Sequence, residues 1–324
     1  MEYLQYALEP LGPWLIDAEM IEVSVNPDGK VWLIKRGDVT MSFAGLTLDQ
    51  GVAERLTNLI AGNTHTKTGQ NNLLVSATIQ YRDRPIRAQS VLPPAAFGGA
   101  ALSFRMFSTI PINQIELAYL YSKSCPASQR RAEKLATLRQ LIEGADLIDT
   151  LRFCVEKRLN ILVSGGTETG KTVVLRKLVS FIPYDSRLIT IEDAPELFPG
   201  HPNHVSLVAD RSGDVRSADK LLEASLRMRP DRLIVGEVRG REAMTFLEAI
   251  NTGQEGGFAT IHCETPELAR DRLAIAASRS GIPMTYDNFL TYIDRTIDVI
   301  IQTGRNGAMR GISEIYLPGQ EAAA

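Results

Sequence analysis

Eight consecutive residues, from Gly165 to Thr172, have the composition of a loop that binds phosphates. Their sequence, GGTETGKT, fits the pattern G-x-x-x-x-G-K-[ST]. In such a loop the glycines let backbone N–H groups surround the phosphates, and the ammonium of Lys171 offsets the charge of the β- and γ-phosphates. The hydroxyl of Thr172 is suited to ligate Mg²⁺. The sequence thus predicts that ATP and Mg²⁺ are bound by Gly165, Gly166, Thr167, Glu168, Thr169, Gly170, Lys171 and Thr172.

The neighbouring residues supply the elements that this loop needs. Residues 159–164 predict a buried strand before the loop, and residues 173–181 predict a helix after it. A glycine-rich turn without function is the alternative, but such a turn does not require a strand, a lysine and a helix in register. Glu168 is unexpected, because a carboxylate near phosphates weakens their binding unless it points outward or pairs with a cation.

Two further apolar runs end in acidic residues. Residues 233–237 read LIVGE and residues 189–193 read ITIED, so each run delivers a carboxylate at a strand end. Such a carboxylate can hold the metal or orient and deprotonate the attacking water. Glu237 and Glu192 are therefore both candidate metal ligands and candidate catalytic residues, and either could activate the water. A solvated loop charge or a helix cap is the alternative for each acid alone.

A histidine ends one more predicted strand. His262 follows Thr260 and Ile261, and its imidazole could hydrogen-bond the γ-phosphate or the acids and so report the nucleotide state to the sheet. A histidine on its own would be interpreted as structural. We therefore include His262 among the candidate catalytic residues because of its place after a strand.

Helical and strand patterns alternate from about residue 132 onward. Alternation of this kind indicates an α/β fold with a mostly parallel sheet covered by helices, whose ligand site lies at the carboxyl ends of the strands. Besides 159–164, strands are predicted at 187–191, 232–235, 257–261, 297–303 and 311–317, and helices at 218–226 and 243–251.

The amino-terminal part has a different pattern. Between about residues 22 and 106, short β-rich runs alternate with turn residues. They predict strands at 21–25, 31–34, 72–81, 86–92 and 101–105, and residues 48–61 predict a helix. This pattern is typical of an α+β domain. Residues 109–131 are mixed in composition and contain Pro111 and Pro126, which favours a linker with a hinge. We predict an amino-terminal α+β domain at 1–108, a linker at 109–131 and an ATPase domain at 132–324.

The composition limits where the chain can act. A length of 324 residues favours two domains, and a hydrophobic share of 44% with a mean hydropathy of -0.06 indicates a soluble protein. The net charge of -3 does not favour nucleic acid as a partner. The three cysteines lack C-x-x-C spacing, and no apolar run is long enough to span a bilayer, so we expect a cytoplasmic protein. An apolar stripe near the start could touch lipid, although core packing is commoner. The stripe comprises Leu4, Leu8, Leu11 and Leu15.

The order of these motifs resembles a known family. The phosphate-binding loop is followed by TIED at 190–193, by RPDRLIVGEVRG at 229–240 and by TIH at 260–262. Traffic ATPases of type II and type IV secretion systems carry a phosphate loop, an aspartate box, an acidic second nucleotide motif and a histidine box in this order. The resemblance covers nearly all of residues 132–310. GEVRGREA at 236–243 is similar to the type IV secretion branch, and the absence of a tetracysteine zinc element from the sequence counts against the larger pilus- and type II-assembly ATPases.

This resemblance implies an architecture and a setting. It implies an amino-terminal α+β domain followed by a RecA-like P-loop ATPase domain, with nucleotide between them. It also implies a homohexameric ring in the cytoplasm, at the inner face of the inner membrane, with inner-membrane secretion channel components as partners. Peripheral membrane association fits this setting, and no stable nucleic-acid binding is expected.

The resemblance extends to the amino-terminal half. Residues 87–94 and 102–105 are similar to the amino-terminal domain of the type IV branch, whose arginines reach toward nucleotide. Arg87 and Arg105 inherit that role, with solvated arginines at a sheet edge as the alternative. Gln254 departs from the family, which often has histidine there, and Glu168 replaces a small or polar residue. Both departures leave the turnover rate open.

Three other functions share these motifs. A type IV pilus retraction motor would differ in its neighbouring genes, which would encode pilins. A nucleic-acid motor or recombinase would show ATP hydrolysis stimulated by DNA and strongly salt-dependent binding. A non-hydrolysing nucleotide-gated scaffold would bind ATP and assemble without releasing phosphate.

Overall fold

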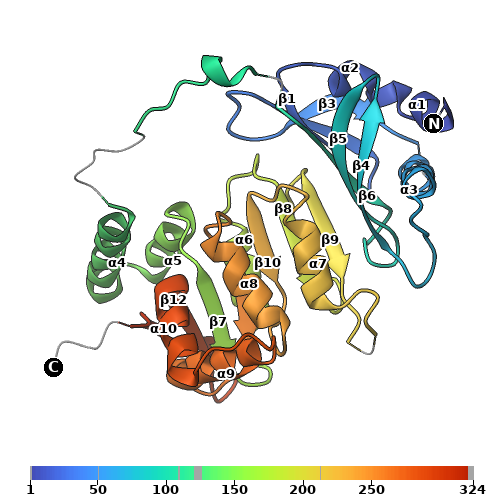
Figure 1. Ribbon diagram of the computed structural model, residues 1–324. Coiled ribbons are helices and arrows are strands. Elements are labelled where there is room, and N and C mark those ends of the chain that lie inside the picture. Colours follow the sequence, from blue (N-terminus) through green and yellow to red (C-terminus); the bar gives the residue numbers. More distant parts are fainter. Residues whose placement is uncertain (1, 50, 109, 120–125, 212, 320–324) are drawn as a thin grey trace. The chain divides into compact units, whose positions relative to one another are not determined.

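The computed structural model describes residues 2–49, 51–108, 110–119, 126–211 and 213–319 (Figure 1). Within the predicted linker, residues 109 and 120–125 lie outside the described residues, and so do residues 320–324 of the predicted ATPase domain. The chain divides into two compact units. The first comprises Met1–Ser108 with Pro183–Gly236, and the second comprises Thr109–Ile182 with Glu237–Ala324.

The first unit contains a six-stranded antiparallel sheet in the order β3-β2-β1-β6-β5-β4. At the turn between β1 and β2, Gly29 has a φ of +82°, and a Cβ there would lie 2.3 Å from the carbonyl oxygen of Leu48, so glycine is required. The sequence pattern predicted all of these strands except β3. The strands are β1 (Met20–Val25), β2 (Lys30–Lys35), β3 (Ser42–Thr47), β4 (Leu74–Tyr81), β5 (Arg84–Val91) and β6 (Ala101–Met106).

The helices of this unit bury the apolar stripe of the first fifteen residues. They are α1 (Glu2–Ala7), the 3₁₀ turn η1 (Glu9–Leu11), α2 (Gly12–Leu15) and α3 (Val52–Asn63). All four leucines of the stripe are at most 3% exposed, so they pack in the core, as the commoner interpretation of such stripes predicts.

The first unit also contains three parallel strands in the order β10-β8-β9, with the helix α7 (Ala218–Ser225). The segment after β5 pairs with β9: the N–H of Phe97 donates to the carbonyl of Ser206 at 2.9 Å, and the N–H of Val208 donates to Ala95 at 2.8 Å. These bonds join the parallel strands to the antiparallel sheet. The sequence pattern did not predict β9. The strands are β8 (Leu188–Glu192), β9 (His204–Val208) and β10 (Arg232–Val235).

A buried polar cluster also joins the two sheets of the first unit. Arg187, at the start of β8, is fully buried, and its guanidinium donates to Asn26 at 2.7 Å and to Asn203 at 2.5 Å. Glu22 on β1 is 1% exposed, and burial raises the pKa of its carboxyl to about 7. The charge of Arg187 acts in the opposite direction, because it stabilises the carboxylate.

The second unit contains the strands β13-β12-β7-β11, in this order. β7 pairs in parallel with both β11 and β12, whereas β13 is antiparallel to β12. Every residue of β7 is buried, so this strand lies in the core. The strands are β7 (Ile161–Gly165), β11 (Phe258–Ile261), β12 (Val299–Asn306) and β13 (Met309–Tyr316).

Helices cover this part of the sheet, as the alternating pattern predicts. The pattern did not single out α5, α9 or α10. None of the helices in the described residues is both long enough and apolar enough to cross a membrane. The helices of this unit are the short η2 (Ile112–Gln114), α4 (Ala127–Gly144), α5 (Leu147–Glu156), α6 (Lys171–Val179), α8 (Glu242–Asn251), α9 (Pro266–Ser278) and α10 (Tyr286–Thr296).

Candidate active site

The predicted phosphate-binding loop connects β7 to α6. Gly170 precedes the helix with a φ of +96°, a conformation that favours glycine. Gly165 is required for a different reason: a Cβ there would lie 1.9 Å from the Thr303 hydroxyl oxygen and 2.5 Å from that of Thr169. These two hydroxyls are 2.7 Å apart, and Thr303 also donates to the carbonyl of Ser164 at 2.9 Å. The end of β7 is thus held closely against β12.

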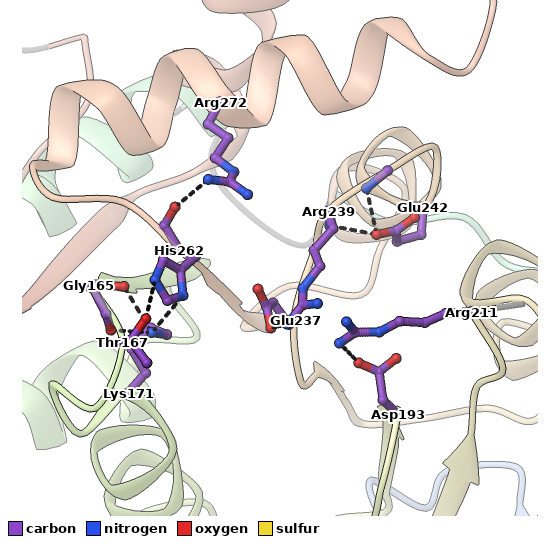
Figure 2. Close-up of polar contacts among 12 residues, drawn as sticks. Gly165, Thr167, Lys171, Asp193, Arg211, Glu237, Arg239, Glu242, His262 and Arg272 are labelled. Atoms are coloured by element: carbon purple, nitrogen blue, oxygen red, sulfur yellow. Dashed lines mark hydrogen bonds and ion pairs between the residues drawn. The ribbon is translucent and has the colours of Figure 1, made fainter.

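Lys171 lies folded back on the loop. Its ammonium donates to the carbonyl oxygens of Gly165 at 2.8 Å and Gly166 at 2.7 Å, and lies 3.4 Å from Nδ1 of His262 (Figure 2). Burial lowers the pKa of Lys171, while the nearby charge of Glu237 acts in the opposite direction. Because an ammonium only donates, Nδ1 of His262 accepts this hydrogen bond.

His262 connects the loop with the end of β11. Burial is the main cause that lowers the pKa of His262 from 6.5, and the charges of Lys171 and Arg272 lower it further. The imidazole is therefore neutral near pH 7. With Nδ1 as an acceptor, Nε2 carries the proton and donates to the Thr167 hydroxyl at 3.1 Å. Arg272 donates to the carbonyl of His262 at 2.9 Å. The histidine thus contacts two residues of the loop, Thr167 and Lys171, and its role in reporting the nucleotide state stays a prediction.

Glu237 lies in the same compact unit as the loop. Its side chain is 18% exposed and forms an ion pair with Arg239 (Figure 2). The turn that follows is fixed by Glu242, whose Oε1 accepts from the N–H groups of Arg239 at 2.6 Å and Gly240 at 2.8 Å. The pKa of Lys171 responds to the charge of Glu237, so this carboxylate acts on the loop electrostatically.

Glu192 has a different environment, in the first unit. Only 6% of the residue is exposed, and Oε1 accepts hydrogen bonds from the N–H groups of Glu196 at 3.0 Å and Leu197 at 3.1 Å. Burial raises the pKa of this carboxyl, and the two N–H donors oppose that shift. The neighbouring acid, Asp193, forms an ion pair with Arg211 (Figure 2). Glu192 therefore holds the loop that follows β8, and its predicted catalytic role remains a prediction.

Arg87 and Arg105 are neighbours on the sheet of the first unit. They lie directly opposite each other on β5 and β6, and both are exposed. The guanidinium of Arg87 lies 5.9 Å from the centre of the Phe107 ring. Like charges directly opposite each other are unfavourable unless an anion offsets them. On β1, Glu22 lies opposite Arg105, and the charge of Arg105 acts to lower the pKa of that carboxyl. The nucleotide-binding role of Arg87 and Arg105 stays a prediction.

Glu168 meets both conditions under which a carboxylate is tolerated beside phosphates. Its side chain is 66% exposed, and its carboxylate lies 3.7 Å from the guanidinium of Arg310 on β13. Its backbone has a φ of +58°, which turns the chain at the tip of the loop.

The residues at this loop fit a nucleoside triphosphate. Lys171 supplies a cation, and no side chain within the described residues caps the start of α6, which favours negative charge. Sequence analysis missed Thr303 and Arg239 as parts of the site. Thr303 is 139 positions from Ser164, and only the pairing of β12 with β7 brings them together. Arg239 is part of a quoted motif, but nothing in the sequence indicates that it pairs with Glu237.

Comparisons with known proteins identify the family of this chain. Residues 94–303 match the family model described as "Type II/IV secretion system protein". The chain is 31% identical over 327 residues to the type IV secretion system protein VirB11 of Brucella suis, covering 97% of this chain and 90% of the relative. It is 30% identical over 325 residues to protein VirB11 of Rhizobium radiobacter, covering 97% and 93%.

A solved structure supports the fold. The crystal structure of the VirB11 ATPase from the Brucella suis type IV secretion system, in complex with sulphate, is similar with a TM-score of 0.84 and 29% identity. The match covers 97% of this chain and 94% of the other. It confirms the predicted fold class, an amino-terminal α+β domain followed by a RecA-like P-loop ATPase domain. The chain therefore belongs to the type II/IV secretion system protein family.

Proposed function

We propose that this chain hydrolyses ATP and energises a type IV secretion or conjugation-like channel. One observation carries this proposal: Lys171 contacts both the phosphate-binding loop and His262, and the charge of Glu237 acts on the pKa of Lys171. The VirB11 relatives, each matched over 97% of this chain, favour this setting over a pilus retraction motor.

The residues at the loop divide the chemistry among them. Lys171 exchanges the carbonyls of Gly165 and Gly166 for the β- and γ-phosphates and offsets their charge. Thr172 would hold Mg²⁺, which would offset phosphate charge when bound. Glu237 orients or deprotonates the attacking water, and Glu192 is the alternative for this role and for holding the metal.

The arginines of the sheet provide a further source of positive charge. Arg87 and Arg105 stabilise the charge that develops on the transferred phosphate, when nucleotide lies between the domains at 1–108 and 132–324. Closure about the linker at 109–131 then converts hydrolysis into movement. Small-angle scattering with a non-hydrolysable ATP analogue tests this part: compaction is expected in the wild type and is expected to be reduced in Arg105→Ala.

The proposed assembly is a homohexameric ring in the cytoplasm, docked at the inner face of the inner membrane. Its partners would be the inner-membrane components of the channel, with peripheral membrane contact and without stable nucleic-acid binding. Light scattering with ATP tests the ring, and copurification with the channel proteins encoded nearby tests the partners.

The Lys171→Ala variant tests the site itself. Loss of the cation is expected to reduce turnover by about 10² to 10³-fold or more while the protein stays folded, because the residue is not part of a core. Lys177→Ala, an exposed change on the same helix, is the matched control and is expected to keep wild-type activity. Wild-type turnover in folded Lys171→Ala would rule the loop out.

Two measurements separate the remaining alternatives. Stimulation of hydrolysis by DNA, with strongly salt-dependent binding, would favour a nucleic-acid motor. Nucleotide binding and assembly without any phosphate release would favour a non-hydrolysing scaffold.

A further inference from the structure

A second cavity lies at the other end of β7, away from the phosphate-binding loop. Its volume is about 550 Å³, and it is lined by the start of α4, by residues that precede β7 and β12, and by the ends of α8 and α10. Leu159 and Asn160 form part of its floor, just before the first residue of β7. All of its lining residues belong to the second compact unit.

Positive charge dominates this cavity. Two carboxylates line it, and one of them, Asp298, is fully engaged: Oδ1 pairs with Arg131 at 2.7 Å, and Oδ2 accepts from the N–H of Asn160 at 2.8 Å. The other carboxylate, Glu255, is exposed. The basic side chains of the lining are Arg130, Arg131, Lys134, Arg158 and Arg295.

Two of these basic side chains, Arg131 and Lys134, cap helix ends. Arg131 donates to the carbonyls of Asp294 at 3.1 Å and Ile297 at 3.2 Å, at the end of α10. Lys134 donates to the carbonyl of Lys157 at 3.2 Å, at the end of α5. These bonds satisfy helix ends. The lining also includes Arg130, Arg158 and Arg295, so the cavity holds five basic side chains.

Arg158 has a left-handed backbone conformation, which glycine adopts with less strain than arginine does. It follows α5 with a φ of +55°, and the N–H of Leu159 donates to the carbonyl of Cys154 at 2.9 Å, which closes the helix end. This closing pattern strongly favours glycine at the position that arginine takes here. The chain thus keeps a guanidinium at the cavity in spite of an unfavourable backbone conformation.

We propose that this cavity binds a small ligand that carries two or more phosphate groups. Guanidinium groups bind phosphates through paired hydrogen bonds, and several arginines around one cavity suit more than one phosphate. A volume of about 550 Å³ is in the range of small-molecule sites, which favours such a ligand over an extended acidic peptide. The phosphates can belong to a soluble compound or to a phospholipid head group.

Isothermal titration with tripolyphosphate tests the site on the full-length protein. The phosphate-binding loop is first saturated with ADP and Mg²⁺, and wild type is expected to bind tripolyphosphate in addition. Binding is expected to persist in Lys171→Ala, because that change affects the other end of β7. Absence of this binding in the wild type overturns the proposal, whether or not the protein hydrolyses ATP.

Arg158→Gly is the decisive variant, because it removes the charge and relieves the backbone at once. Its melting temperature is expected to equal or exceed that of wild type, while its affinity for tripolyphosphate falls by about tenfold or more. Arg295→Gln is expected to weaken binding in the same way. Arg139→Gln, an exposed change on α4 that does not line the cavity, is the matched control and is expected to bind normally. Unchanged affinity in both Arg158→Gly and Arg295→Gln overturns the proposal.

Flotation with anionic phospholipid vesicles identifies the source of the phosphates. Flotation that tripolyphosphate abolishes and that Arg158→Gly lacks supports a head group, and tripolyphosphate binding without flotation supports a soluble compound. Self-association of the chain that blocks tripolyphosphate binding and depends on Arg158 would instead indicate that acidic residues of a second copy fill the cavity, which overturns the proposal.

Discussion

Glu192 and Glu237 each follow an apolar strand, but their carboxylates differ in burial and in partners. Glu192 is 6% exposed and accepts two backbone N–H groups, whereas the Glu237 side chain is 18% exposed and pairs with the side chain of Arg239. Glu237 also acts on the pKa of Lys171.

This difference distinguishes structural from chemical use of the same residue type. A carboxylate that accepts main-chain hydrogen bonds is committed to holding a loop, and moving it costs those bonds. A carboxylate that pairs with an exposed side chain can change partner when substrate arrives. The comparison therefore favours Glu237 for water activation and Glu192 for local stability.

The largest expected effect is on turnover. Glu237→Gln keeps the shape of the side chain but removes the base, so ATP turnover should fall by about 10² to 10³-fold while ATP binding is retained. Glu192→Gln should stay within about tenfold of wild type. Steady-state kinetics and nucleotide titration of both variants measure this. A slow Glu192→Gln beside an active Glu237→Gln would reverse the two assignments.

The next effect is on stability, where the change at Glu192 should have the larger effect and the change at Glu237 the smaller one. Glu192→Ala leaves two N–H groups, those of Glu196 and Leu197, without their acceptor and should lower the free energy of unfolding by about 2–4 kcal/mol. Glu237→Ala should cost less than about 1 kcal/mol. Urea denaturation measures both, and Glu192→Gln, which keeps an acceptor oxygen, should recover most of the loss. Equal losses for the two alanine variants would remove the proposed distinction.

Glu22, which is buried like Glu192, extends the comparison to pH. The pKa of Glu22 is raised from 4.5 to about 7, so the folded protein binds this proton more tightly than the unfolded chain does. The resulting stability is present below about pH 4.5 and is lost as pH rises to about 7. Relative to Glu22→Gln, wild type should lose up to about 3 kcal/mol across this window in urea denaturation. A difference that does not change with pH would show that Glu22 titrates normally.

The smallest expected effect concerns the acid in the phosphate-binding loop. Glu168 is exposed and paired with Arg310, so Glu168→Ser should strengthen ATP binding by only about two- to fivefold. The gain should shrink at high salt, because exposed charges are screened. A fluorescent ATP analogue measures it, with Glu143→Ser on α4 as the control. A loss of affinity instead would indicate that Glu168 contributes to binding.

Sequence patterns predicted the elements around the site well where neighbouring residues determine them. The loop at 165–172, the strand before it and the helix after it are all present, because glycine torsions and a helix start are local properties. The β9 strand was not predicted. It pairs at its edge with the segment at 95–97, and a sequence pattern carries no information about such a distant partner.

By itself, the sequence determined the chemistry at the loop: which residues can surround phosphates, which acids and which histidine follow strands, and that the fold is α/β. The tertiary structure alone decided which of these groups meet. Lys171 contacts His262, and the Thr303 side chain lies close against Gly165. These contacts form because the register of parallel strands is fixed only when the connecting helices pack. The same packing gathers the arginines of α4 and α10, together with Arg158 after α5, around the second cavity, and no local pattern in the sequence predicts this arrangement.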